Sequence, residues 1–261
     1  NYAICVSWTH KLSINIMTKT AILIPSRLSA TRLPGKPLFK INGISIISHV
    51  VKKAKEADVG EVYVATEDKE ILEDVNSNGG KAILTSNKHK TGSDRIFECY
   101  EKLSLVDIDY IINLQGDEPD ININDLKHLT KLIELYKPEI GTLASEIEDK
   151  SNLNNENIVK VITDTKITDK NFPIALDFKR KANNLNSNIY HHLGIYAYKP
   201  MILKQLVKLE QTNKEIKNRL EQLRAIDNKI KINVGLAKFC PIGVDTMEDY
   251  LALKKKLEYN S

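Results

Sequence analysis

The residues best suited to chemistry lie in a loop that follows the first apolar run of the chain. Residues 21–24 have the length and composition of a short buried strand, and we predict that Pro25 ends it. The residues that follow show no helical period, but they carry three cations: Arg27, Arg32 and Lys36. Fixed positive charge on a loop after a strand suits a polyphosphate. A solvated basic loop has the same composition, so charge alone leaves both interpretations open.

This loop differs from the common phosphate-binding loop of nucleoside triphosphatases. Its Gly-Lys pair at 35–36 is followed by Pro37 where that motif has Ser or Thr, and the upstream glycine of the motif is missing. A different kind of phosphate-handling loop is therefore expected.

Two isolated acids follow strand-like segments elsewhere in the chain. Asp117 lies in the loop 115–119 that follows the apolar run 109–114, and Asp245 lies in the turn 243–246. A carboxylate at the end of a buried strand, close to a polyphosphate, is a typical ligand for a hard cation. Gly, Asp and Pro are also ordinary turn residues, and Asp245 could equally cap the helix that follows it.

Strand-like and helix-like segments alternate through the first half of the chain, which predicts a mostly parallel, doubly wound α/β sheet. We expect strands at 61–66, 81–85, 109–114, 141–146, 159–163, 191–198 and 231–237. We expect helices at 44–56, 69–78, 91–103, 125–137, 201–209, about 214–228 and 247–257, and a flexible excursion at 165–189. Ligands of such sheets bind at the carboxyl ends of the strands. The loops 25–37, 66–68, 91–95 and 115–119 should therefore share one edge.

Composition narrows the class of protein. The chain has 261 residues, 42% of them apolar, with a net charge of +4, which suits one large α/β domain and an anionic small substrate better than nucleic acid. Cys5, Cys99 and Cys240 form no close pair, so neither a zinc site nor a disulfide framework is predicted, and a reducing cytoplasm is expected. No apolar run approaches the ~18 residues that would cross a membrane.

The first sixteen residues precede Met17 and lack the pattern of a signal peptide. We interpret residues 1–16 as an N-terminal extension and residues 17–261 as the functional domain. Deleting residues 1–16 is expected to leave kcat and KM unchanged in a steady-state assay. A large loss of activity would assign the extension a part in function.

Taken together, the motifs resemble the 3-deoxy-manno-octulosonate cytidylyltransferase (CMP-Kdo synthetase) family. The resemblance covers residues 21–257 and rests on segments that keep the family's order: IPSRLSATRLPGKPL, HKTGSDR, NLQGDEP, HHLGIYAY, LEQLR and GVDT. It implies a Rossmann-like nucleotide-diphospho-sugar transferase fold with a smaller dimerisation lobe within about 148–230. It also implies a Mg²⁺-dependent reaction, in which the anomeric hydroxyl of 3-deoxy-D-manno-octulosonate (Kdo) attacks the α-phosphate of CTP. CMP-Kdo and pyrophosphate are the products, and the CMP-Kdo serves lipopolysaccharide synthesis.

The same resemblance assigns roles to individual residues. It implies CTP binding and charge neutralisation by Pro25, Ser26, Arg27, Arg32, Lys36, Thr66, Ser93 and Arg95. It implies Mg²⁺ ligation by Asp117 and Asp245, with Asp117 also counted as catalytic alongside Arg27, Arg32 and Lys36. It implies Kdo binding by Gln115, Arg180, His192, Tyr196, Glu221 and Gln222. The partners expected are CTP, Kdo and a second copy of the chain in a cytoplasmic homodimer, with no nucleic acid and no membrane insertion.

Two segments depart from the family's pattern. Where the family has Tyr-Phe-Ser-Arg followed by Pro-Trp, residues 177–182 keep the arginine, Arg180, but lack the serine and the Pro-Trp pair, and residues 214–219 are more basic than expected. Both departures fall on the sugar and dimer side. Two alternatives therefore stay open: a cytidylyltransferase for another 2-keto acid sugar, and a CTP-binding protein that has lost catalysis.

Overall fold

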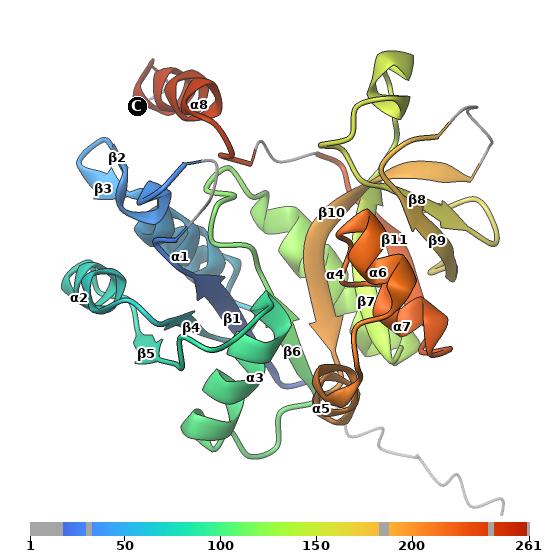
Figure 1. Ribbon diagram of the computed structural model, residues 1–261, viewed down its shortest axis with the longest axis horizontal. Coiled ribbons are helices and arrows are strands. Elements are labelled where there is room, and N and C mark those ends of the chain that lie inside the picture. The colour runs from blue at the N-terminus through green and yellow to red at the C-terminus, as the bar shows by residue number, and fades with distance from the viewer. Residues whose placement is uncertain (1–17, 30–32, 183–187, 240–242, 260–261) are drawn as a thin grey trace, which may run out of the picture.

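A nine-stranded mixed sheet forms the body of the computed structural model, which describes residues 18–29, 33–182, 188–239 and 243–259 (Figure 1). The strand order is β11-β7-β10-β6-β1-β4-β5, and β8 and β9 extend it from β10. Only β10 runs antiparallel to its neighbours in the main path, so the prediction of a mostly parallel sheet is confirmed. The strands are β1 (Thr20–Ser26), β4 (Glu61–Thr66), β5 (Ala82–Leu84), β6 (Tyr110–Asn113), β7 (Ile140–Ser145), β8 (Lys160–Thr163), β9 (Ala175–Lys179), β10 (Ile189–Tyr198) and β11 (Ile232–Leu236).

Helices cover both faces of this sheet, as expected for a doubly wound fold. Side chains of β1 alternate between two apolar clusters, with Ile22 and Ile24 on one face and Leu23 on the other. The first cluster is closed by α1 (Ile46–Ala57), α2 (Lys69–Ser77) and α4 (Ile123–Tyr136), and the second by α3 (Gly92–Leu103), α5 (Pro200–Lys208) and α7 (Leu223–Asp227). The remaining helices are α6 (Asn213–Asn218), α8 (Met247–Tyr259) and the short 3₁₀ turns η1 (Lys36–Leu38) and η2 (Lys150–Leu153). Among the described residues, no helix combines the length and the apolar character needed to cross a membrane.

The prediction that Pro25 ends the first strand is wrong, because β1 continues to Ser26 with Pro25 opposite Ala65 of β4. Leu114 N–H donates to Leu23 O, so Leu23 and Pro25 turn their backbone groups toward β6. Strand β6 has ended by the level of Pro25. The missing N–H therefore costs no ladder hydrogen bond.

Two further predictions need correction. The region 165–189 contains a regular strand, β9, which pairs with β8. The helix expected at 214–228 is two short helices, because Arg219 adopts a left-handed conformation (φ 53°) and ends α6. Asp68 does not cap α2 through its side chain; that carboxylate accepts from Leu28 N–H at 2.7 Å and anchors the basic loop.

A small hairpin, absent from the sequence-based prediction, packs against the C-terminal helix α8. Strands β2 (Lys40–Ile41) and β3 (Ile44–Ser45) pack beneath α8, and Tyr250 donates a hydrogen bond to Lys40 O at 2.8 Å. Val244 and Leu253 complete the same apolar cluster. Figure 1 shows α8 lying beside this hairpin. This packing places the turn before α8 beside the basic loop that contains Lys36.

Candidate functional site

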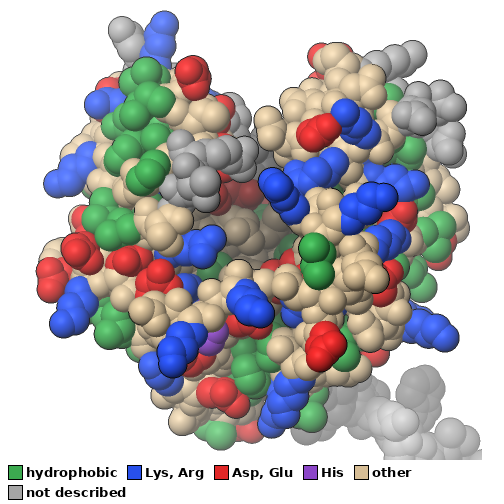
Figure 2. Space-filling view, viewed as in Figure 1, with side chains coloured by type: hydrophobic (Ala, Val, Ile, Leu, Met, Phe, Trp, Pro, Cys, Tyr) green, Lys and Arg blue, Asp and Glu red, His purple; other side chains and the backbone are tan. Residues whose placement is uncertain are grey.

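The first of two adjoining cavities opens at the carboxyl ends of β1 and β6 and has a volume of about 300 Å³. Three of the four loops predicted to share this edge contribute to it, and the loop 66–68 does not. Figure 2 shows the molecule hollowed between its two halves, with basic side chains along the rim. The cavity is lined by Pro25, Ser26, Arg27, Lys36, Pro37, His89, Lys90, Thr91, Gly92, Arg95, Gln115, Gly116 and Asp117.

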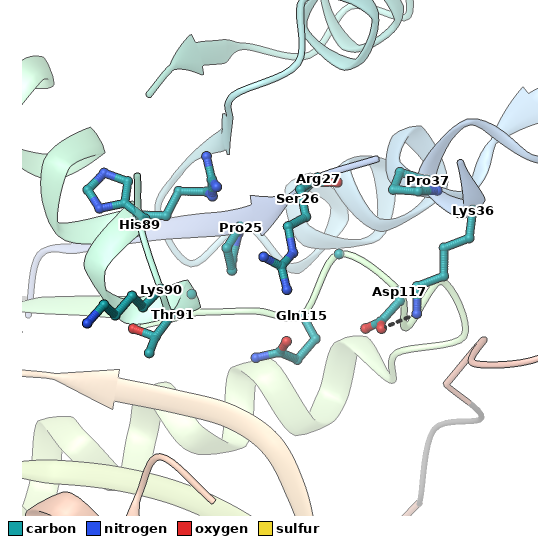
Figure 3. A pocket seen from close by; sticks show the side chains of 13 residues that line it. Pro25, Ser26, Arg27, Lys36, Pro37, His89, Lys90, Thr91, Gln115 and Asp117 are labelled. Atoms are coloured by element: carbon teal, nitrogen blue, oxygen red, sulfur yellow. Dashed lines mark hydrogen bonds and ion pairs between the residues drawn. The ribbon is translucent and has the colours of Figure 1, made fainter. Parts of the chain in front are cut away.

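Positive charge dominates this first cavity. Arg27 is exposed at the end of β1, and Figure 3 shows its side chain extending over the cavity while Lys36 reaches Asp117. Arg95 is buried in the wall, where it donates to Thr85 Oγ1 at 2.7 Å and pairs with Glu67. Ser26 Oγ is buried without a hydrogen-bond partner among the described residues. The cavity therefore offers cations and an unsatisfied hydroxyl to an anionic ligand.

The backbone of the basic loop fixes Lys36. Gly35 adopts φ 74°, a conformation that favours glycine, and its N–H donates to Leu28 O at 3.0 Å. The 3₁₀ turn η1 then starts at Lys36, whose side chain is 11% exposed. Arg32, the third cation predicted in this loop, lies outside the described residues.

The Lys36 ammonium brings the two predicted acids together. Its Nζ lies 2.6 Å from Asp117 Oδ2 and 3.3 Å from Asp245 Oδ1, and it donates to Val244 O at 2.5 Å. Val244 N–H donates to Asp117 O at 2.9 Å, so the two acidic loops are also joined through their backbones. A single cation thus already bridges these carboxylates, which are separated by more than a hundred residues along the chain.

These carboxylates form a small oxygen-donor set suited to a divalent cation. Mg²⁺ often takes only one or two carboxylates from a protein and fills its shell with phosphate oxygens and water. No group of three or more His, Cys, Asp or Glu side chains that could hold a metal occurs in the described ranges. Asp117 and Asp245 are 34% and 42% exposed, and of the two only Asp117 is among the described residues that line the first cavity.

Glu118 is an acid that the sequence analysis did not assign. Its Oε2 atom is buried and has no hydrogen-bond partner within the described part of the chain. Burial, followed by the negative charges of Asp117 and Asp245, raises the pKa of Glu118 to about 8. In the sequence, the only indication of a role for Glu118 was its position next to Asp117. An acidic residue in a predicted turn gives no indication that its side chain is buried.

The second cavity, about 250 Å³, adjoins the first and shares Gly92 and Gln115 with it. Five of the six residues expected to bind a sugar line it: Gln115, His192, Tyr196, Glu221 and Gln222. Its other lining residues are Gly92, Ser93, Asn113, Val159, Gly194, Tyr198, Leu206 and Leu220. Three distant segments, the end of β6, strand β10 and the turn between α6 and α7, therefore meet in one hollow.

Burial disfavours the charged forms of the ionisable groups in the second cavity. It lowers the pKa of His192 to about 3, with a small contribution from His191, and raises the pKa of Tyr196 well above its usual value. Burial also raises the pKa of Glu221, against opposing hydrogen bonds from Ser93 and Thr91. Glu221 Oε1 and Asn113 Oδ1 are buried without partners among the described residues. These are the features of a pocket that binds hydroxyl groups.

Three predicted site residues lie elsewhere than expected. Ser93, expected beside the nucleotide, lines the second cavity. Thr66 is fully buried and lines neither cavity; its hydroxyl accepts from Asp68 N–H at 3.1 Å. Arg180 lines a separate basic groove, where it donates to the carbonyl oxygens of Asn218, Glu156 and Arg219 at 2.8 to 3.0 Å.

Asn113, Thr91 and Tyr198 were missed by the sequence analysis. Asn113 is the polar last residue of an otherwise apolar strand, a signal that could have been used. Thr91 was recognised only as a helix start, and it does form a capping box with Asp94. Tyr198 gave no signal, because an aromatic residue in a strand usually belongs to the core.

A buried ion pair supports the turn that carries Glu221 and Gln222. Arg224 donates to both carboxylate oxygens of Glu215, at 2.9 and 2.6 Å, and both side chains are 3% exposed. Burial would raise the pKa of Glu215, but the hydrogen bonds from Arg224 and Gln211 outweigh it and lower that pKa. The pair thus holds α6 and α7 on either side of the turn.

Arg224→Met should reduce the free energy of unfolding by about 3–5 kcal/mol at pH 7, since it leaves Glu215 buried and unpaired. Because the folded-state pKa of Glu215 lies below its ordinary value of 4.5, the stabilisation is present above pH 4.5 and is lost as pH falls through the folded-state pKa. The difference in the free energy of unfolding between wild type and variant should therefore become smaller at acidic pH. Urea unfolding at pH 7 and near pH 4 measures both effects. Lys81→Met, which breaks the exposed pair Lys81–Glu61, is the control and should change stability little; an equal loss in both variants would contradict the prediction.

The fold and the two cavities define a nucleotidyltransferase, and comparison with known proteins specifies the kind. Residues 21–232 match the family model described as cytidylyltransferase. The chain belongs to the 3-deoxy-manno-octulosonate cytidylyltransferase family, as its curated relatives show. It is 43% identical to the protein of that name from Thermodesulfovibrio yellowstonii, over 91% of this chain and 98% of the relative. It is 40% identical to the one from Afipia carboxidovorans, over 91% and 96%.

A solved structure agrees with this family. The fold superposes with a TM-score of 0.84 on a CMP:2-keto-3-deoxy-manno-octonic acid synthetase complexed with CTP, which is 33% identical and is matched over 94% of this chain and 100% of the other. UDP-glucose pyrophosphorylase, at 16% identity and a TM-score of 0.70, shares the fold. The fold class and the family resemblance expected from the sequence are thereby confirmed.

Proposed function

We propose that this protein transfers the cytidylyl group of CTP to Kdo and releases pyrophosphate. The observation that carries the proposal is the junction of two cavities across Gln115 and Gly92, one with several cationic side chains and one with no Lys or Arg among the described residues that line it. A nucleotide in the first cavity and a sugar in the second would meet at this junction. The names of the relatives support CTP and Kdo as the two substrates.

The residues of the first cavity would act by positioning and charge neutralisation. The sugar hydroxyl attacks the α-phosphorus, and pyrophosphate leaves in line with the attack. Arg27 and Lys36 would hold the triphosphate and oppose the charge that grows on the leaving pyrophosphate. Arg95, held rigidly by Thr85 and Glu67, would fix the near edge of the nucleotide.

Asp117 and Asp245 would hold Mg²⁺. The fit rests on the Lys36 ammonium, a cation that both carboxylates already contact. When bound there, Mg²⁺ would neutralise negative charge on the phosphates. Lys36, which contacts the same carboxylates, would also neutralise charge on the triphosphate.

The second cavity would bind the sugar through hydrogen bonds. Tyr196 and Gln222 offer donors, and the unpartnered oxygens of Asn113 and Glu221 offer acceptors. Exclusion of water from this pocket would strengthen those hydrogen bonds. We further propose that the product serves lipopolysaccharide synthesis in the cytoplasm. The proposed organisation is a homodimer of a domain spanning residues 17–261, with its smaller lobe within about 148–230.

A second candidate is a CTP-binding protein without turnover. One observation favours it: none of the described residues lining the second cavity is Lys or Arg, and Arg180 is held by three carbonyl oxygens in another groove. The carboxylate of a 2-keto acid sugar needs a cation. Whether a residue of this protein supplies that cation decides between the enzyme and the CTP-binding protein without turnover.

Pyrophosphate release tests the proposal. With CTP and Mg²⁺, Kdo should support turnover and a sialic acid should not. Turnover with a sialic acid and not with Kdo would assign another 2-keto sugar. CTP binding by calorimetry without pyrophosphate release from either sugar would support the second candidate.

A further inference from the structure

Strand β10 is interrupted where it borders the second cavity. Leu193 pairs with Leu143 of β7, but the next paired residue is Tyr196, opposite Thr142. Gly194 and Ile195 are therefore bulged out of the ladder between β10 and β7. Bulges of this kind re-aim side chains next to functional sites. Here the residues on both sides of the bulge, His192 and Tyr196, line the cavity.

One hydroxyl contacts the backbone carbonyls at this bulge. Thr142 is fully buried, and its Oγ1 lies 2.6 Å from Ile195 O and 3.3 Å from Leu193 O. The carbonyl between them, Gly194 O, accepts from Gln115 Nε2 at 3.2 Å. Each buried carbonyl of the bulge thus has a side-chain donor, and removing a donor would leave a buried polar group unsatisfied.

The same hydroxyl fixes the tautomer of His192. Thr142 Oγ1 also lies 3.0 Å from His192 Nε2. A threonine hydroxyl has one proton, and the shortest contact assigns it to Ile195 O. The oxygen must then accept from His192, so Nε2 carries the imidazole proton and Nδ1 keeps the lone pair. The ring is neutral in this buried place.

The bulge also supports the junction between the two cavities. A Cβ atom at Gly194 would lie 3.1 Å from Gln115 Cγ, so the amide side chain rests directly on this glycine. Gln115 lines both cavities. Any shift of the bulge would therefore move Gln115 as well as His192.

We propose that Thr142 is a positioning residue for the sugar: its hydroxyl holds the β10 bulge and presents the Nδ1 lone pair of His192 as an acceptor for a sugar hydroxyl. This inference rests on the proposed function, in which the second cavity takes Kdo. Thr142 itself does not line the cavity, so its effect is transmitted through His192 and Gln115.

The test compares Thr142→Val, which keeps the shape and removes the hydroxyl, with Thr142→Ser, which keeps the hydroxyl. Thr142→Val should raise KM for Kdo about 10- to 100-fold, with the Kd for CTP unchanged. Thr142→Ser should stay near wild type. Thr163→Val is the matched control, since Thr163 is also buried and its hydroxyl donates to Thr165 O at 2.7 Å, away from both cavities. A Thr142→Val protein with the wild-type KM for Kdo, or a Thr142→Ser protein as impaired as Thr142→Val, would overturn the proposal.

A spectroscopic measurement tests the same inference without relying on turnover. Long-range ¹H–¹⁵N correlation spectra of the wild-type protein should show His192 protonated at Nε2, and Thr142→Val should lose that preference. A wild-type His192 protonated at Nδ1 would refute the inference, even if Thr142→Val failed to fold. If Kdo is not a substrate at all, the proposed function fails, while the His192 tautomer still decides whether Thr142 orders the cavity.

Discussion

Asp117→Asn is expected to lower kcat by about 1000-fold or more while the Kd for CTP stays within a few-fold of wild type. The reason is the position of this carboxylate at the end of β6, within 2.6 Å of the Lys36 ammonium and tied by its backbone to Val244. An amide keeps the shape but removes the charge that a divalent cation needs. CTP binding should survive, because Arg27, Lys36 and Arg95 still line the nucleotide cavity. Pyrophosphate release and calorimetry with CTP measure the two effects separately.

Asp120→Asn is the matched control for that experiment. Asp120 lies in the same loop, but its carboxylate pairs with Lys256 at the surface, at 2.6 Å. The control should keep nearly full activity. An Asp117→Asn protein that turns over at the wild-type rate would remove Asp117 from the reaction. Equal loss in both variants would indicate that the loop, and not the charge of Asp117, is what matters.

Lys36→Ala is expected to lower kcat about 100-fold or more, and to lower it by a larger factor than it raises KM for Kdo. The ammonium would neutralise charge on the triphosphate, and this interaction strengthens as pyrophosphate leaves. A contact that gains strength toward the transition state affects kcat more than substrate binding. Because Lys36 also competes for Asp117 and Asp245, its removal should not weaken Mg²⁺ binding measured by calorimetry in the absence of CTP.

Lys40→Ala controls for the loss of a nearby charge. Lys40 is exposed on β2, and no ion pair involving it is found among the described residues. Its removal should leave kcat unchanged. If Lys36→Ala raised KM for Kdo while kcat stayed at the wild-type value, Lys36 would serve sugar binding instead of the triphosphate.

Much of this protein could be predicted from its sequence, because the relevant signals are local. Strand β4 was predicted with its observed bounds, 61–66, since alternating β-branched residues mark a strand without reference to the rest of the chain. The order of strands and helices then predicts parallel connections, and the carboxyl ends of parallel strands meet at one edge. That reasoning placed the loops 25–37 and 115–119 at one edge, and Arg27, Lys36, Gln115 and Asp117 from these loops line one cavity.

The tertiary structure alone decided which residues far apart in the sequence contact one another. The contact between Lys36 and Asp245 depends on the packing of α8 against the β2–β3 hairpin. No local sequence pattern predicts that packing. Arg180 does not line the sugar cavity, because its guanidinium donates to the carbonyl oxygens of Asn218 and Arg219 at the end of α6. Thr142 reads as an ordinary strand residue until the bulge in β10 leaves two carbonyls beside its hydroxyl. A hydrogen bond is formed only when folding places donor and acceptor within about 3 Å, so the sequence can name the groups but not the pairs they form.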